Sequence, residues 1–468
     1  MKRISEKKSN KIIDKRRNKE QKKKILFLQI MGLFICLGIV LVIANFFRQK
    51  LSDHTISKMI VSTEEETKVS LITESFVETI PETTITPTET TEIPLPETEP
   101  TLPEPTELLP ENPVAEAYFG TLPVASRAEP LRSFEARAIY IGMLGFDTTV
   151  VDFIRDTHIN SVVIDLKESD GVKFNTKNQL AHEIDAVYSG AIDLRSVIEQ
   201  YHAEDIKVIG RIVCFKDPLL AEKEPDRSIK GASGTPLLFS NEDRKNFINP
   251  YDVRNWEYNI ELALEAVEAG VDEIQFDYVR FPVGNTTTGE RPYFGEPDVT
   301  PEKYEVIDRF LQTARIRIQD EYGVPLSADV FGIILSGGAS GDNLGQNWET
   351  VGLTGISAVC PMVYPSHYAL NSGLNGHTFP KPDLQPYEVI YHALLSGKDI
   401  ADTPGFSVVR PYLQAFTASW IGSGNYLSPY RYEHINAQIK AVYDAGYKEW
   451  ILWNPGAYYP EGVYDGVQ

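Results

Sequence analysis

The sequence predicts an α/β fold, a (β/α)8 barrel of the TIM type, for residues 131–468. From residue 131 onward, short apolar runs that indicate strands alternate with helical runs, which is typical of βαβ units and a parallel sheet. Eight such strands occupy about 330 residues, a length within the range for this barrel with insertions. A doubly wound open sheet is the alternative fold.

The barrel strands can be placed by their short apolar runs. We expect them at residues 136–142, 161–167, 207–213, 271–277, 325–332, 356–364, 407–416 and 449–455. The predicted helices cover residues 148–157, 194–204, 252–269, 301–322, 387–396 and 432–445. The third helix has an apolar face that includes Trp256, Ile260 and Leu264, and Gly270 is its expected C-terminal stop.

Two long irregular segments interrupt the alternation, at residues 214–250 and 283–300. The first is too long for a passive connection, so we interpret it as a candidate binding loop. The open-sheet alternative would be favoured by a glycine-rich phosphate turn after the first strand. IYIGMLGFDTT lacks that spacing, and GxxxxGK[ST] is absent from the sequence.

The segment before the barrel divides into three parts. Residues 1–24 form a basic tail with 12 Lys/Arg against 3 Asp/Glu, a net charge of +9. The whole chain has a net charge of −21, so the residues after the tail carry a net charge of −30. Residues 25–47 contain no charge and are long enough for a transmembrane helix. They exceed the apolar core of a signal peptide, the alternative interpretation, so we predict an uncleaved signal-anchor.

The basic tail predicts a cytoplasmic N-terminus, which places the C-terminal domain outside the cell membrane of a single-pass protein. Residues 48–130 are rich in Thr, Glu and Pro, and such a segment cannot bury enough apolar surface to fold. We therefore predict a disordered linker between the membrane and the barrel. The three cysteines lie on separate predicted elements and suggest no disulfide framework.

Polar side chains gather at the predicted strand ends, where parallel α/β proteins build their sites. The string VDEIQFDYVRFP brings Asp277 to the end of the fourth strand and Arg280 into the loop that follows. Because side chains alternate between the two faces of a strand, one face should carry Asp165 and Lys167 together. Arg211 and Asp329 are the corresponding residues of the third and fifth strands.

Two carboxylates on neighbouring strands suit a glycosidase, in which one acts at the anomeric carbon and the other protonates the leaving oxygen. Asp277 and Asp329 are the candidate catalytic residues. The candidate substrate-binding residues are Asp165, Lys167, Arg211, Arg280, Tyr364 and Trp453, the aromatic members serving with Trp420 as platforms for sugar rings. A structural ion pair between Asp277 and a nearby arginine is the alternative.

The histidines have no metal-binding spacing, and we predict neither a metal site nor a cofactor. The charge of −30 outside the basic tail, without a basic patch, argues against nucleic-acid binding. Partners are expected to be a polysaccharide or oligosaccharide and, through the N-terminal helix, the membrane.

Six strings, taken in order, resemble the putative glycosyl hydrolase domain family, first catalogued as a domain of unknown function: RAIYIG, VVIDLKESDG, IGRIVCFKDPLLAEKEPD, NPYDVRNWEYNIELALEAVEAGVDEIQFDYVRFP, SADVFG and VCPMVYPSHY. The resemblance covers roughly residues 135–460 and implies a sugar-active barrel. FDYVRFP is similar to the fourth-strand end of retaining α-glycosidase barrels, which implies a nucleophile at Asp277. An acid at the end of the fifth strand would be Asp329. Gln275 stands where those barrels often place an arginine.

The sequence thus predicts a membrane-anchored, extracytoplasmic glycoside hydrolase that cleaves a cell-envelope or extracellular polysaccharide with paired carboxylates. The alternative is a non-catalytic glycan-binding barrel that acts as a cell-surface scaffold or receptor.

Overall fold

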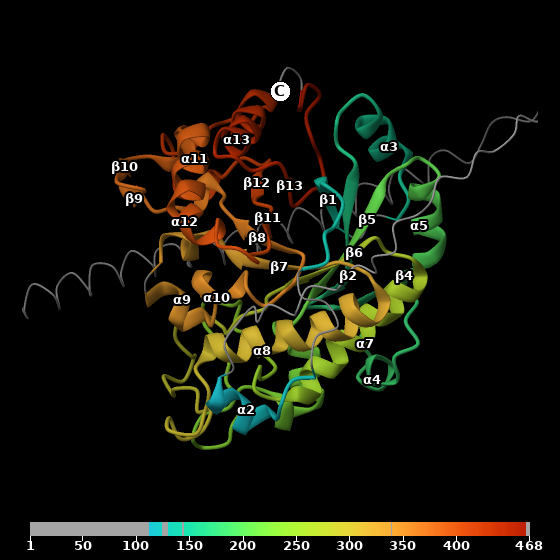
Figure 1. Cartoon of the computed structure of the whole chain (residues 1–468), viewed down its shortest axis with the longest axis vertical. Helices are drawn as coiled ribbons and strands as arrows, with labels where there is room; N and C mark the ends of the chain where they lie inside the picture. The colour runs from blue at the N-terminus through green and yellow to red at the C-terminus, as the bar shows by residue number, and fades with distance from the viewer. Residues whose placement is uncertain (1–111, 124–129, 143–144, 338, 465–468) are drawn as a thin grey trace, which may run out of the picture. The chain divides into compact units, whose positions relative to one another are not determined.

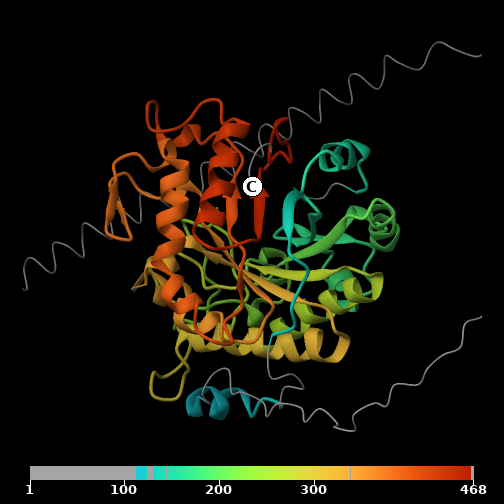
Figure 2. The same ribbon diagram turned by 45° about the horizontal axis from the view of Figure 1, so that its top comes forward.

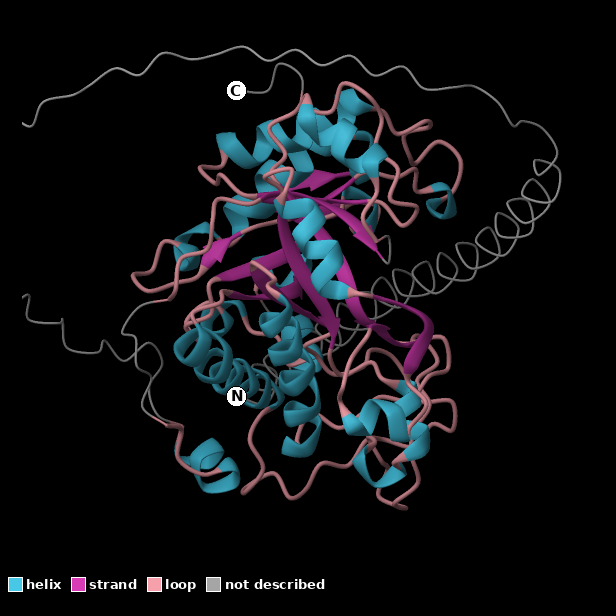
Figure 3. Ribbon diagram, turned by 90° about the vertical axis from the view of Figure 1, so that its right-hand side faces the viewer, coloured by secondary structure: helices cyan, strands magenta, loops and turns pink. Residues whose placement is uncertain are grey.

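The computed structural model describes residues 112–123, 130–142, 145–337 and 339–464. Its centre is a closed barrel of eight parallel strand positions, as the sequence predicts, and Figure 3 shows the strands enclosed by helices. The first strand pairs with both the second and the last, which closes the barrel. The strands are β1 (Arg137–Gly142), β2 (Ser161–Glu168), β5 (Lys207–Val213), β6 (Glu273–Asp277), β7 (Leu326–Phe331), β8 (Ala358–Met362), β11 (Val408–Val409) with β12 (Tyr412–Gln414), and β13 (Trp450–Trp453).

The predicted helices form the outer layer, and Figures 1 and 2 show them around the strands. The seventeen-residue helix α7 ends at Gly270, whose φ of 108° is a left-handed conformation that favours glycine. The predicted helix over residues 301–322 ends earlier, since after Arg315 the chain continues as a π-helical turn, Ile316–Asp320. The long helices are α3 (Thr148–Arg155), α5 (Leu194–His202), α7 (Val253–Ala269), α8 (Lys303–Arg315), α11 (Pro386–Ser396) and α13 (Tyr432–Asp444).

The seventh strand position is split, although the sequence predicts one strand over residues 407–416. β11 (Val408–Val409) pairs with β8, and β12 (Tyr412–Gln414) pairs with β8 and β13. The break contains Pro411, which has no N–H to donate to a neighbouring strand. Its carbonyl still accepts a bond from the Ile451 N–H, so the barrel stays closed across the break.

Several short elements were not expected from the sequence. Between β2 and α5, the chain forms an excursion in which β3 pairs antiparallel with β2 and β4 pairs parallel with β3. Another hairpin, β9–β10, follows β8. The added elements are β3 (Gly171–Phe174), α4 (Gln179–Glu183), β4 (Val187–Ile192), α6 (Pro218–Lys223), α9 (Ala339–Leu344), α10 (Trp348–Val351), β9 (Ser372–Leu374), β10 (His377–Phe379) and α12 (Lys398–Ala401).

Two separate groups of buried apolar side chains hold the barrel. The larger lies between strands and helices and includes Ile164, Ile212 and Phe276. The smaller fills the barrel interior and includes Val163, Ile209 and Ile451. Neighbouring strand residues thus enter different cores, because successive side chains point to opposite faces.

A charged cluster closes the amino-terminal end of the barrel. Arg410 and Glu273 are both fully buried and form two hydrogen bonds of 2.6 and 3.1 Å. Arg410 Nε donates to Glu449 at 2.7 Å, and the hydroxyls of Ser133 and Ser327 donate to Glu273. Every oxygen of the Glu273 carboxylate therefore has a partner.

The predicted cytoplasmic tail, membrane span and most of the linker lie outside the described residues. Within the part of the chain that is described, no helix is long and apolar enough to cross a membrane. A short helix, α2 (Pro113–Phe119), falls in the segment predicted to be disordered. Its Phe119 ring lies 4.8 Å from that of Trp256 on α7, and Figure 2 shows α2 beside α8.

Replacing Arg410 tests how much the basal ion cluster stabilises the barrel. In Arg410→Gln the buried Glu273 carboxylate loses its charged partner, so we expect the free energy of unfolding to fall by about 3–5 kcal/mol. Denaturant unfolding measures the change. Arg155→Gln is the matched control, because that exposed arginine pairs with an exposed Asp152 and should have little effect. Equal stability of the two variants would contradict the expectation.

Candidate active site

The carboxyl ends of four neighbouring strands bring one arginine and four acids together at the barrel mouth. The register sets Asp165 of β2 opposite Arg211 of β5. Phe276 of β6 faces Ala328 of β7, so the next residues, Asp277 and Asp329, are neighbours as well. With Glu168 at the end of β2, these residues form what we call the mouth cluster: Asp165, Glu168, Arg211, Asp277 and Asp329.

Arg211 connects the mouth cluster. Its Nη1 donates to Asp165 Oδ1 at 2.5 Å and to Glu168 Oε1 at 2.6 Å. Its Nη2 and Nε donate to Asp277 Oδ2 at 2.5 and 3.1 Å. The Arg211 side chain is 9% exposed, so these bonds form largely away from water, where an ion pair is stronger than on the surface.

Asp277 and Asp329 lie within reach of one bound molecule. Arg211 Nε is 3.1 Å from Asp277 Oδ2 and 3.9 Å from Asp329 Oδ2, so these two oxygens are at most about 7 Å apart. Carboxyl groups in glycosidases stand about 5–5.5 Å apart in retaining enzymes and about 6.5–9.5 Å apart in inverting ones. The distance limit is compatible with a paired-acid mechanism.

The two acids have different surroundings. Asp329 is only 1% exposed, and its Oδ1 is buried without a hydrogen-bond partner. Burial and the adjacent Asp277 carboxylate raise the pKa of Asp329 well above its usual range, although Arg211 opposes this. Asp277 instead accepts two bonds from Arg211, and its Oδ1 accepts the Tyr278 N–H at 2.5 Å. The arrangement favours a proton on Asp329, whereas Asp277 is held by hydrogen bonds from Arg211 and Tyr278.

The outer acids of the cluster also differ from each other. Burial raises the pKa of Asp165 to about 6, against the attraction of Arg211. Its Oδ2 accepts the Tyr140 hydroxyl at 2.6 Å. Burial also opposes ionisation of Glu168, but the charge and hydrogen bond of Arg211 outweigh it and lower the pKa of Glu168. Glu168 is therefore the more readily ionised of the two.

The other half of the mouth is aromatic. Tyr364, after β8, and Trp453, on β13, have ring centroids 5.7 Å apart. Phe416 lies 5.2 Å from Trp453, and Trp420 stacks on Phe416 at 5.6 Å. Tyr140 lies 6.0 Å from Trp453 and joins this group to the mouth cluster through Asp165. We call Tyr140, Tyr364, Phe416, Trp420 and Trp453 the aromatic wall.

The structure places Lys167 apart from the mouth cluster, contrary to the strand alternation expected for β2. Its ammonium lies 2.9 Å from Asp217, donates to the Val213 carbonyl and lies over the Tyr258 ring of α7. The cause is a register shift between Asp165 and Lys167, which gives Glu168 the place beside Arg211. Nothing in the local sequence indicates this bulge. Strand alternation therefore predicted Lys167, and not Glu168, on the same face as Asp165.

Arg280 is also bound elsewhere than in the mouth cluster. It is 2% exposed, donates to Glu242 Oε1 at 2.8 Å, and its guanidinium lies 4.6 Å from the Tyr278 ring. Glu242 comes from the long segment after β5, where Lys216 lies 3.3 Å from it. Arg280 thus fastens the candidate binding loop to the end of β6.

Tyr278, directly after Asp277, has a φ of 52°, a left-handed conformation that is costly for a non-glycine residue. Such strain persists only where the surroundings enforce it. The Arg280–Glu242 pair and the Phe215 N–H, which donates to the Tyr278 carbonyl, provide that enforcement. The turn directs the Tyr278 N–H at Asp277 Oδ1, which helps to fix the carboxylate.

Gln275 occupies a lower level of the barrel interior. Its side-chain oxygen accepts the Tyr412 hydroxyl at 2.5 Å, and its amide nitrogen lies 3.6 Å from Cys360 Sγ. Arg211 stands opposite Gln275 in the register of β5 and β6. The arginine beside Asp277 is therefore supplied by the neighbouring strand.

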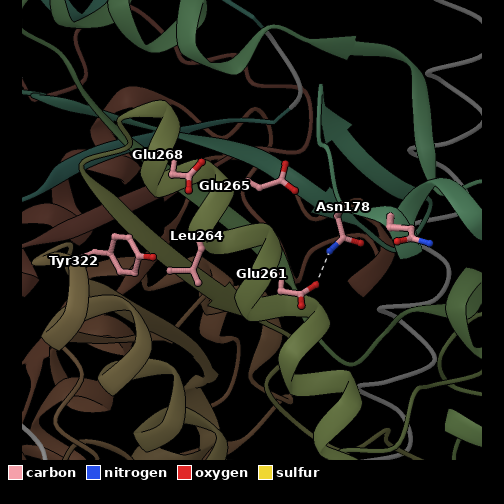
Figure 4. Close-up of a pocket in the computed structure, with 7 residues that line it drawn as sticks. Asn178, Glu261, Leu264, Glu265, Glu268 and Tyr322 are labelled. Carbon is pink, nitrogen blue, oxygen red and sulfur yellow. Dashed lines mark hydrogen bonds between the residues drawn. The ribbon is translucent and has the colours of Figure 1, made fainter.

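A hollow on the outer wall is a separate feature. Figure 4 shows Glu261, Glu265 and Glu268 of α7 around it, with Asn178 and Tyr322 nearby. Two of these acids are already bonded, since Asn178 donates to Glu261 and the Lys177 N–H donates to Glu265. They hold the β3–β4 excursion against α7. Among the described residues, no group of three or more His, Cys, Asp or Glu side chains is arranged to hold a metal ion.

Solved structures provide three comparisons. A hypothetical protein from Ruminiclostridium thermocellum ATCC 27405 is 37% identical and similar over 41% of this chain and 97% of that one, with a TM-score of 0.37. The PgaB (BpsB) glycoside hydrolase domain from Bordetella bronchiseptica is 11% identical over 69% and 94%, with a TM-score of 0.49. The α-galactosidase TtGalA from Thermus thermophilus is 12% identical over 72% and 61%, with a TM-score of 0.43.

No curated protein matches the sequence. A family model does match it, over residues 138–459, and its description is "Putative glycosyl hydrolase domain". The match spans more than half of the chain and includes every strand of the barrel except the first residue of β1. The chain belongs to the putative glycosyl hydrolase domain family.

Proposed function

We propose that this protein is a glycoside hydrolase that cleaves a cell-envelope or extracellular polysaccharide with Asp277 and Asp329. The observation that carries the proposal is the pair itself, two acids at most about 7 Å apart, of which Asp329 has a raised pKa and Asp277 is hydrogen-bonded to Arg211. Membership of the glycosyl hydrolase family supports the same reaction class.

In the proposed reaction, Asp329 is the general acid and gives its proton to the glycosidic oxygen as the C–O bond breaks. Asp277 is negatively charged and acts on the other reacting atom, where it attacks the anomeric carbon or stabilises its developing positive charge. Arg211 is a positioning residue that holds the Asp277 carboxylate in place through two hydrogen bonds. Water completes the hydrolysis.

Sugar rings would rest on the aromatic wall. Ring faces present C–H surface that packs well on aromatic side chains, while the hydroxyl groups reach the polar half of the mouth. Tyr140 connects this platform to the acids through its hydrogen bond to Asp165, and Trp420 extends it by stacking on Phe416.

We further propose that the enzyme acts outside the cell membrane, held there by the predicted anchor of residues 25–47. The support comes from the sequence, through the uncharged run, the basic tail before it and the Thr/Glu/Pro-rich linker after it. An anchored barrel on a long linker would reach polymers of the cell envelope.

Substituting the two acids tests the proposed roles. We expect Asp277→Asn and Asp329→Asn each to lower kcat by about 10²–10⁴ on any glycan that the wild type cleaves, because each removes an ionisable group from the reaction. Products of a glycan panel are read by mass spectrometry. The exposed Asp298→Asn is the control. Full activity of Asp277→Asn would exclude the assignment, and glycan binding without any turnover would favour a non-catalytic barrel.

If Asp329 is the general acid, its raised pKa determines the pH above which kcat/KM falls. The acid works only while protonated, so kcat/KM should hold below the raised pKa of Asp329 and fall about tenfold per pH unit above it. Steady-state rates across pH measure this fall. In Asp329→Asn the residual activity should lose it, and an unchanged alkaline fall in that variant would assign the proton to another group.

Substituting a residue of the aromatic wall should weaken substrate binding without slowing the chemical step. Trp420→Ala removes the outer platform, so KM should rise about tenfold while kcat changes little. Michaelis–Menten kinetics on an oligosaccharide substrate separate the two constants. Tyr322→Ala, at the hollow on the outer wall, is the control for loss of a half-exposed ring. A fall in kcat with unchanged KM would remove Trp420 from the binding surface.

A further inference from the structure

The mouth cluster carries more acids than its single cation can neutralise. Arg211 contacts Asp165, Glu168 and Asp277, and lies 3.9 Å from Asp329. Even with a proton on Asp329, three carboxylates share one guanidinium. Buried charges are normally paired, so a concentration of unbalanced negative charge in this largely buried cluster is costly without a further cationic partner.

Basic side chains near the mouth relieve this excess only in part. Lys216 adds to the attraction that Arg211 exerts on Glu168, but each of these basic side chains is also paired with acids of its own. Lys167 lies 2.9 Å from Asp217. Arg280 and Lys216 both bond to Glu242, and Lys216 also lies 3.7 Å from Asp243.

One acid oxygen of the cluster has no hydrogen-bond partner, and one side chain of the cluster is partly exposed. The Asp329 side chain is 99% buried, and yet its Oδ1 has no hydrogen-bond partner. The Glu168 side chain is 28% exposed, the highest value in the cluster, and its position at the end of β2 faces Arg211. A ligand entering the mouth therefore meets a carboxylate first and an unpartnered acid oxygen deeper in.

We propose that the glycan of this site carries protonated amino groups, as a de-N-acetylated hexosamine polymer does, and that Glu168 binds the amine. This inference rests on the proposed function of the mouth as a glycan site. An ammonium group adds the missing positive charge and donates charge-assisted hydrogen bonds to carboxylates. A uronic acid would add a negative charge to the excess and be repelled.

The aromatic wall supports the same substrate class. Aromatic faces attract cations as well as sugar C–H groups, so the Tyr364 and Trp453 rings do not penalise an ammonium beside them. An N-acetylated sugar gains from the rings but lacks the charge that the mouth cluster requires. The structure thus distinguishes the free amine from its amide.

Binding of matched oligosaccharides to the full-length protein tests the inference. Tetrasaccharides of glucosamine and of galactosamine are compared by calorimetry with their N-acetylated counterparts and with a galacturonate tetrasaccharide. We expect at least one amine to bind about tenfold more tightly than its amide. This preference should shrink as salt rises from about 0.01 to about 1 M, since the Debye length falls from about 30 to about 3 Å.

Glu168→Gln provides the residue-level test. It keeps the size of the side chain, removes one charge, and should lose most of the amine preference while N-acetylated ligands bind as before. Glu199→Gln, an equal charge change on the exposed face of α5, should keep the preference. The wild-type comparison of amine with amide needs no variant, so a folding defect in Glu168→Gln leaves the inference testable.

Equal affinity for amine and amide, tightest binding of galacturonate, or no binding of any amine would each overturn the inference. Hydrolysis of the same oligosaccharides is measured separately. Cleavage of neutral glycans without amine preference would refute the amine specificity and leave the hydrolase proposal standing. Amine-selective binding without cleavage of any glycan would refute the hydrolase proposal and leave the amine specificity standing.

Discussion

The geometry of the barrel mouth depends on one buried guanidinium that holds several acids. Without Arg211, Asp165, Glu168 and Asp277 would repel one another in a region with little water to screen them. The barrel makes this possible by setting β2, β5 and β6 side by side, so that one side chain reaches partners on both neighbouring strands. The same arrangement leaves Asp329 at 3.9 Å from Arg211, too far for a hydrogen bond. Burial and the adjacent Asp277 carboxylate then raise the pKa of Asp329 well above its usual range.

Sequence reasoning placed the barrel and brought Asp277 and Asp329 together, because both depend on local regularities. Alternation of strands with helices predicts the barrel, and β6 and β7 pair without a register shift, so strand parity holds. Strand parity failed on β2, because a bulge after Asp165 turns Lys167 away from Arg211 and places Glu168 beside it. The sequence also did not predict the contacts of Arg280, whose place depends on the left-handed Tyr278 and on Glu242, 38 residues earlier in the chain. Neither a bulge nor a long-range ion pair leaves a mark in local sequence.

The departure at Gln275 illustrates how a barrel can keep a chemical environment while changing the residue that supplies it. Gln275 bonds to Tyr412 within the interior, and the cation beside Asp277 comes from Arg211 at the same level of the next strand. Adjacent strands are about 4.8 Å apart, a distance that an arginine side chain spans easily. What a carboxylate at this position needs is a nearby positive charge, and its origin in the chain is secondary.

The interpretation of Asp277 and Arg211 as a purely structural ion pair can be judged against the ion cluster at the opposite end of the same barrel. There, Glu273 and Arg410 are fully buried, and each Glu273 oxygen accepts from Arg410 and from a serine. That cluster is saturated and closed. The mouth cluster has four acids around one arginine, where the basal cluster has two, and it also has an unpartnered buried oxygen on Asp329 and a partly exposed Glu168. A cluster that only stabilised the fold would gain from having every carboxylate oxygen hydrogen-bonded, as Glu273 has at the basal end. The incompletely bonded acids at the mouth therefore favour a role in ligand binding.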